Sequence, residues 1–254
     1  MNDLVDLDGA LARLERDADG LAAVVDSADL TAPVAACPGW DVRALAVHVG
    51  TIHRWATVAV RTAAPPERGA VARPDDGASP EELAAWLRLG AGVLADVLAT
   101  TEPTAPSWHP FPWEQSARFW PRRQMVETAL HRWDAEVATA GESTIEPEVG
   151  VVGIGEYFEL GLPRVLQLAE LDAPAPSLHV HVTDDGLPEG AGEWVVDAVD
   201  GTLRVREEHR RADAALRGPA ADVLLVLMGR LDRSAVEVVG DPDAAAAWLD
   251  LPGW

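Results

Sequence analysis

The sequence predicts an α+β protein in which an N-terminal four-helix bundle is followed by a smaller α+β domain with a mainly antiparallel sheet. Two observations predict this class. Apolar residues recur at helical spacing in four segments before residue 142, whereas the segments after residue 177 alternate apolar and polar side chains as strands do. The composition changes at Gly141-Glu142-Ser143, so we expect a bundle domain over residues 1–142 and a second domain over residues 147–254.

Each bundle helix is predicted from its apolar stripe and, for two of them, from a residue that favours a helix N-terminus. Asp41 follows the Pro-Gly-containing turn over residues 37–40 and is expected to cap the second helix, and Ser79 is expected to cap the third. The four helices are expected over residues 7–30, 42–56, 79–99 and 115–140.

The second domain is predicted from strand alternation and from turn signals such as Asp200-Gly201. We expect strands over residues 178–182, 193–198, 203–207, 212–217 and 236–239, and helical segments over residues 147–171, 218–230 and 242–249.

Charge and cysteine content restrict the classes of partner and compartment. A formal net charge of −22 argues against nucleic acid and anionic membranes, because both are bound through clustered positive charge. The single cysteine, Cys37, cannot form an intramolecular disulfide, which fits a reducing compartment. The N-terminal residues lack a signal-peptide core, and the longest apolar run, residues 223–228, is too short to span a bilayer. We therefore expect a cytoplasmic protein.

Glu127 and His131 form the candidate site with the clearest chemistry. They lie four residues apart in a predicted helix, so both side chains leave one face and can reach one ion. A third ligand is needed, and His48 on the second helix is the best candidate. Two histidines and one carboxylate leave positions open on zinc or a similar divalent ion, as catalysis requires. The alternative is that both histidines lie at the bundle edge and that Glu127 pairs with Arg123 or Arg132.

The remaining histidines and the cysteine give weaker signals. His53 lies about 140° further round its helix than His48, so the two cannot easily share an ion, and we expect a surface or core-edge position for His53. His179 and His181 alternate on one strand face, but no third ligand is obvious nearby, and strand histidines on a solvated face are commoner. Cys37 has no positioned base in the sequence and is expected to be a small packed side chain.

Two further features bear on function. The segment from Thr101 to Glu114 is rich in proline and contains Trp108 and Trp113, so we expect this loop to cover another part of the molecule. Arg230 ends the apolar LLVLMGR helix and could hold an anion, although an arginine at a helix C-terminus is also stabilised by the helix dipole.

Three segments resemble the mycothiol-dependent maleylpyruvate isomerase family, whose N-terminal half is a DinB-like four-helix bundle. They are CPGWDVRALAVHVGTIHRW at residues 37–55, FWPRRQMVETALHRWDAE at residues 119–136, and GPAADVLLVLMGR at residues 218–230, which is followed by VVGD at residues 238–241. Together they occur in both predicted domains and in the order that the family shows.

The resemblance implies a divalent metal, usually zinc, bound by His48, Glu127 and His131, and a C-terminal α+β domain in which Arg230 corresponds to a family arginine. It also implies mycothiol or another low-molecular-weight thiol as cofactor. The thiolate would add to an electrophilic small molecule, as in an isomerase or a transferase, and Arg230 could hold a substrate carboxylate. We expect a small thiol and a small electrophilic substrate as partners, no nucleic acid, no membrane, and a monomer or weak homodimer.

Two alternative functions stay open at this point. The same site could serve a metal-dependent thiol S-transferase or a hydrolase, in which the ion activates a different thiol or water. A DinB-like module that binds metal without catalysis is the other alternative.

Overall fold

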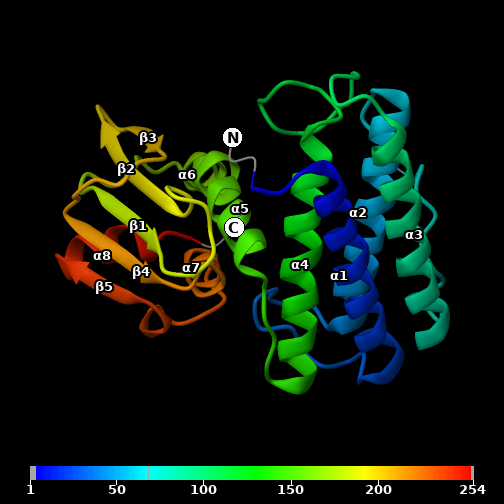
Figure 1. Cartoon of the computed structure of the whole chain (residues 1–254). Helices are drawn as coiled ribbons and strands as arrows, with labels where there is room; N and C mark the ends of the chain where they lie inside the picture. The colour runs from blue at the N-terminus through cyan, green and yellow to red at the C-terminus, as the bar shows by residue number, and fades with distance from the viewer. Residues whose placement is uncertain (1–3, 68, 253–254) are drawn as a thin grey trace. The chain divides into compact units, whose positions relative to one another are not determined.

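The computed structural model describes residues 4–67 and 69–252, which form two compact units. Residues 5–145 form a helical unit, and residues 146–252, with Leu4, form a unit of helices and strands (Figure 1). The α+β class expected from the sequence is confirmed.

The helical unit is a four-helix bundle. Helices α1 and α2 each pack against both α3 and α4, so α1 and α2 lie diagonally opposite each other. Leucine side chains from three of the helices fill the centre, and each one buried stabilises the fold by about 2 kcal/mol. The helices are α1 (Leu7–Ser27), α2 (Val42–Thr62), α3 (Pro80–Thr100) and α4 (Phe119–Ala140), and the fully buried leucines include Leu14, Leu21, Leu45, Leu83, Leu87 and Leu94.

Both predicted helix caps are confirmed. The Asp41 side chain accepts a hydrogen bond from the backbone N–H of Ala44 at 2.8 Å, so α2 begins where the sequence predicts. Ser79 and Glu82 form a capping box, in which each side chain accepts a hydrogen bond from the backbone N–H of the other residue. The Asp41 cap fixes the start of α2, and therefore the position of His48 along it.

The predicted start of the fourth helix was wrong. Helix α4 begins at Phe119 and not at Gln115, because the preceding residues are held in a loop where the N–H of Ser107 donates to the carbonyl of Gln115 at 3.1 Å. In that loop, the ring of Trp108 packs edge-on against Trp55 of α2, with ring centroids 4.9 Å apart. The aromatic loop therefore covers part of the bundle, as expected.

His53 is fully buried, and its predicted surface or core-edge position was wrong. Its Nε2 lies 2.9 Å from Oγ1 of Thr128 on α4, which links α2 to α4. Burial lowers the pKa of His53 to about 4, so the ring is neutral at neutral pH. A neutral, hydrogen-bonded imidazole can be buried at much lower cost than a charged one.

One described helix, α3, is long and apolar enough to cross a membrane by length and composition. Half of its most apolar window is buried, and the helix packs against α1 and α2. Its apolar face therefore belongs to the bundle core.

The second unit combines helices with a five-stranded sheet of order β3-β2-β1-β4-β5. Three strand pairs are antiparallel and only β1 and β4 are parallel, so the sheet is mainly antiparallel, as predicted. Helices α7 and α8 pack on β1 and β4, and α5 packs on α7. The strands are β1 (Leu178–Val182), β2 (Glu193–Val199), β3 (Thr202–Arg206), β4 (Ala214–Gly218) and β5 (Glu237–Gly240).

The helical segment predicted over residues 147–171 contains a π-helical turn. Pro163 has no backbone N–H to donate to the preceding turn, and such a residue disturbs a regular α-helix. The helices of this unit are α5 (Pro147–Glu156), the π-helix Tyr157–Gly161, α6 (Leu162–Ala169), α7 (Ala220–Leu227), the 3₁₀ turn Arg233–Ala235 and α8 (Pro242–Leu249).

Candidate functional site

His48, Glu127 and His131 meet inside the bundle, between α2 and α4. The Nε2 atom of His48 lies 3.1 Å from Oε1 of Glu127, and Nε2 of His131 lies 3.3 Å from the same oxygen. The two imidazole rings are edge-on, with centroids 5.2 Å apart. One ligand atom from each residue lies within 4.8 Å of the other two. The structure brings together all three residues that the sequence selected.

This geometry fits the donor set of a divalent transition metal. Two imidazoles that bind one tetrahedral zinc ion have ring centroids roughly 5 Å apart, because each Zn–N bond is about 2.1 Å long. The observed separation of 5.2 Å agrees with that spacing. Three protein ligands of this kind leave a coordination position open, as catalytic zinc sites do.

The charges around Glu127 keep its carboxyl group ionised. Burial raises the pKa of Glu127, but the positive charge of Arg123 and hydrogen bonds from His131 and His48 outweigh burial, so the pKa lies well below its usual value. Arg123 binds Oε2, whereas both histidines face Oε1. The pairing with Arg123 that the sequence offered as an alternative is therefore present, but it leaves the other oxygen directed at the two rings.

Arg132, the other arginine considered as a partner of Glu127, pairs elsewhere. Its Nε lies 3.1 Å from Oδ1 of Asp17 on α1, and its Nη1 lies 2.5 Å from a carboxylate oxygen of Glu136. Arg132 therefore joins α1 to α4 and does not contribute to the site.

Asp134 orients the His131 ring. Its Oδ2 lies 3.0 Å from Nδ1 of His131, and its side chain is completely buried. This hydrogen bond leaves Nε2 of His131 facing Glu127, and metal-binding histidines commonly have such a carboxylate partner. The Cys37 thiol also hydrogen-bonds to His131. Burial lowers the pKa of His131, but the charge of Glu127 and the bonds from Asp134 and Cys37 raise it well above its usual value.

Trp40 lies against both histidine rings. Its ring centroid is 4.8 Å from that of His48 and 6.4 Å from that of His131. The turn before α2 places it there, because Gly39 adopts a positive φ of 85° and the N–H of Trp40 donates to the carbonyl of Cys37 at 2.9 Å. Trp40 was not among the site residues selected from the sequence. Its place directly before the histidine-bearing helix was the available signal.

A groove of about 560 Å³ opens beside His48. Trp40 and His48 both line it, so the groove reaches His48, one of the three converging side chains. Its other walls come from the first half of α2 and from residues 73–76, and their charged residues are Arg43, Arg73, Asp41, Asp75 and Asp76. A small molecule that enters here meets polar groups next to an aromatic ring, which is typical of ligand sites.

Comparison with known proteins identifies the family. Residues 11–136 match the family described as the mycothiol maleylpyruvate isomerase N-terminal domain, and residues 160–247 match the family's C-terminal domain. The chain belongs to the mycothiol-dependent maleylpyruvate isomerase family. The resemblance seen in the sequence is thereby confirmed in both halves of the chain.

Two solved structures have the same overall fold as this chain. They are crystal structures of the mycothiol-dependent maleylpyruvate isomerase and of a histidine-to-alanine mutant of that enzyme. Each is 13% identical to this chain, with TM-scores of 0.64 and 0.65, and each comparison covers 98% of both chains. No curated protein matches the chain in sequence.

Arg230, which the sequence resemblance implies as the counterpart of a family arginine, lies in the second unit. Helix α7 ends at Leu227, earlier than predicted, and Gly229 adopts a positive φ of 68°. The N–H of Arg230 then donates to the carbonyl of Leu225 at 2.7 Å. The side chain is half-buried in the turn after the helix. Its role in the site stays a prediction.

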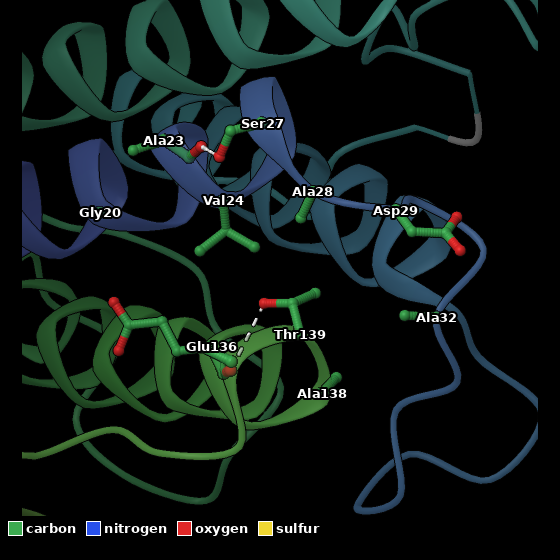
Figure 2. Close-up of a pocket in the computed structure, with 11 residues that line it drawn as sticks. Gly20, Ala23, Val24, Ser27, Ala28, Asp29, Ala32, Glu136, Ala138 and Thr139 are labelled. Carbon is green, nitrogen blue, oxygen red and sulfur yellow. Dashed lines mark hydrogen bonds between the residues drawn. The ribbon is translucent and has the colours of Figure 1, made fainter.

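A second groove in the bundle, of about 620 Å³, lies between the C-terminal parts of α1 and α4 (Figure 2). Small side chains form most of its walls, including Ala23 and Ala138, and Val24 faces Thr139 across it. His48, Glu127 and His131 are absent from its lining, so size alone does not identify the functional groove.

We predict that Asp134→Asn weakens zinc binding at the converging side chains by about 10–100-fold, because an amide no longer fixes the ring of His131 as a carboxylate does. Competition with a chelator measures this affinity. Zinc binding that is lost in Glu127→Gln is assigned to this site.

Asp17→Asn is the matched control for this prediction, since Asp17 is also a buried bundle aspartate but pairs with Arg132. This control should lower thermal stability and leave zinc affinity unchanged. Equal zinc affinity in Asp134→Asn and the unaltered chain would contradict an orienting role for Asp134.

Proposed function

We propose that the chain is a metal-dependent enzyme that uses mycothiol, or another low-molecular-weight thiol, to isomerise or transfer an electrophilic small molecule. The metal would be a divalent ion, with zinc expected, bound by His48, Glu127 and His131 in the N-terminal bundle domain. The observation that carries this proposal is the convergence of three ligand atoms within 4.8 Å, in a chain whose two halves match the two domains of the family.

A bound divalent ion with an open position would lower the pKa of a thiol there and supply a thiolate nucleophile at neutral pH. The protein would then need no catalytic cysteine of its own.

The side chains around the site have separate roles in this proposal. His48 and His131 offer Nε2, and Glu127 offers Oε1, while Arg123 neutralises the second carboxylate oxygen. Trp40 packs against the His48 ring and restricts its rotation. The ligands are thus held in place before any ion or thiol binds, which limits the entropy lost on binding.

The groove beside His48 is the proposed route for the thiol and the substrate. Thr51 offers a hydroxyl in its wall, and Arg43 and Arg73 offer positive charge. Asp41, Asp75 and Asp76 line the same groove, so its charged residues are of mixed sign and do not by themselves select an anionic molecule.

The direct test is an assay of the zinc-loaded protein with maleylpyruvate, with and without mycothiol. We expect turnover only when both zinc and the thiol are present. Glu127→Gln should lower kcat/KM at least about a hundredfold, because a metal centre of this kind supplies several kcal/mol of transition-state stabilisation.

Glu136→Gln is the matched control for this assay, because Glu136 lies on the same helix and also pairs with an arginine. It should retain activity. Turnover without any thiol would favour a hydrolase, and accumulation of a stable thiol adduct would favour an S-transferase. A protein that binds zinc but acts on none of these compounds would support a non-enzymatic module.

We further propose that Arg230 binds a carboxylate of the substrate, as the family resemblance suggests. Arg230→Ala should raise KM for a carboxylate substrate by about 10–100-fold, because a hydrogen bond to a charged group contributes about 1.5–3 kcal/mol. Zinc content should not change. Arg233→Ala is the matched control, since Arg233 lies three residues further on and pairs with Asp250. Equal KM values for the two variants would exclude this role.

A further inference from the structure

The sheet of the second unit carries another cluster of metal-ligating side chains. His179 and His181 alternate along β1 with Leu178 and Val180, which are fully buried, so the two histidines lie on the opposite face of the strand. Glu193 begins β2 and pairs directly with His181 across the two strands. Directly opposed residues in an antiparallel pair share a face, so strand register alone brings these three side chains together.

A third imidazole comes from residues 207–213, the connection between β3 and β4. These strands are separated in the sheet by β2 and β1, so the connection must cross the sheet. It crosses over the histidine face, because the ring centroid of His209 lies 5.1 Å from that of His179 and 5.8 Å from that of His181. The expectation that the two strand histidines have no further ligand nearby was therefore wrong.

One carboxylate connects the three rings. Nε2 of His179 lies 2.5 Å from Oε2 of Glu193, and Nδ1 atoms of His181 and His209 lie 2.6 Å and 3.0 Å from Oε1. Burial raises the pKa of Glu193, but hydrogen bonds from the three histidines outweigh burial and lower it. One ligand atom from each of the four residues lies within 4.8 Å of the other three.

We propose that His179, His181, Glu193 and His209 bind a second divalent transition-metal ion, for which zinc is the best fit. The three ring centroids are 5.1 to 5.9 Å apart and the rings meet at 60° to 88°, so they do not stack, and one nitrogen of each ring faces the Glu193 carboxylate. This spacing is close to the roughly 5 Å expected for imidazoles on one tetrahedral zinc ion. Imidazole-rich sets of this kind suit zinc, copper and nickel, and not magnesium or calcium.

The second site differs in character from the bundle site. Four protein ligands fill a tetrahedral ion and leave no open position, which is typical of structural zinc. The ion would therefore hold the connection over residues 207–213 against β1 and β2. Arg217, the β4 neighbour of His181, pairs with Glu237 at 3.0 Å, so its charge is balanced outside the cluster.

The test compares the zinc content of the full chain with that of a variant carrying both Glu193→Gln and His209→Ala. Each protein is stripped with a chelator, dialysed against buffered zinc and analysed for bound metal by mass spectrometry. The variant should hold one ion fewer per chain. Because the prediction concerns this difference and not the total, it can fail or succeed independently of the bundle site.

Two controls make the outcome decisive. The side chain of His209 is largely exposed, so His209→Ala alone should leave the fold intact, and it should weaken zinc binding by more than the ~10–100-fold that loss of an outer-shell partner costs. Glu208→Gln removes one negative charge, as Glu193→Gln does, but from a residue that lies next to His209 in the sequence and outside the cluster. It should leave zinc content unchanged. Equal zinc content in the unaltered chain and the double variant, or equal zinc affinity in the unaltered chain and His209→Ala, would overturn the proposal.

Discussion

The function proposed for the bundle depends on one set of contacts, in which two imidazoles and a guanidinium group share the Glu127 carboxylate. A carboxylate this deeply buried is costly unless it is paired and fully hydrogen-bonded. Here Arg123 takes one oxygen, and His48 and His131 face the other. The pairing satisfies the buried charge and joins α2 to α4. It also directs two ring nitrogens at one point, so the stabilising contact and the proposed ligand set are the same group of atoms.

The second unit contains a similar arrangement, a carboxylate shared by several imidazoles, on a β-sheet in place of a helix bundle. Glu193 lies among three imidazoles, two from a strand and one from an irregular connection. The proposed functions of the two clusters differ because the clusters contain different numbers of histidines. Two imidazoles and a carboxylate leave room for a thiol, whereas three imidazoles and a carboxylate complete a tetrahedral shell. The same types of ligand can therefore form the proposed reactive metal site in the bundle and the proposed structural metal site on the sheet.

Sequence patterns predicted the elements well but could not predict contacts that depend on side-chain orientation. Helical spacing predicted that Glu127 and His131 share a face, and strand alternation placed β1 over the residues observed. Asp134 was missed because its role depends on which nitrogen of His131 it meets. His209 was missed because it lies in a segment without regular structure, whose path follows only from the strand order. The start of α4 was misplaced because loop hydrogen bonds, which carry no periodicity, compete with the helix.

The most direct test of the account is X-ray absorption spectroscopy at the zinc edge, on a chain that carries Glu193→Gln and His209→Ala and one equivalent of zinc. We predict a first shell of two imidazole nitrogens and a carboxylate oxygen at about 2.0–2.2 Å, and a new sulfur neighbour at about 2.3 Å after mycothiol is added. A first shell without imidazole, or a spectrum that mycothiol leaves unchanged, would contradict the proposed site.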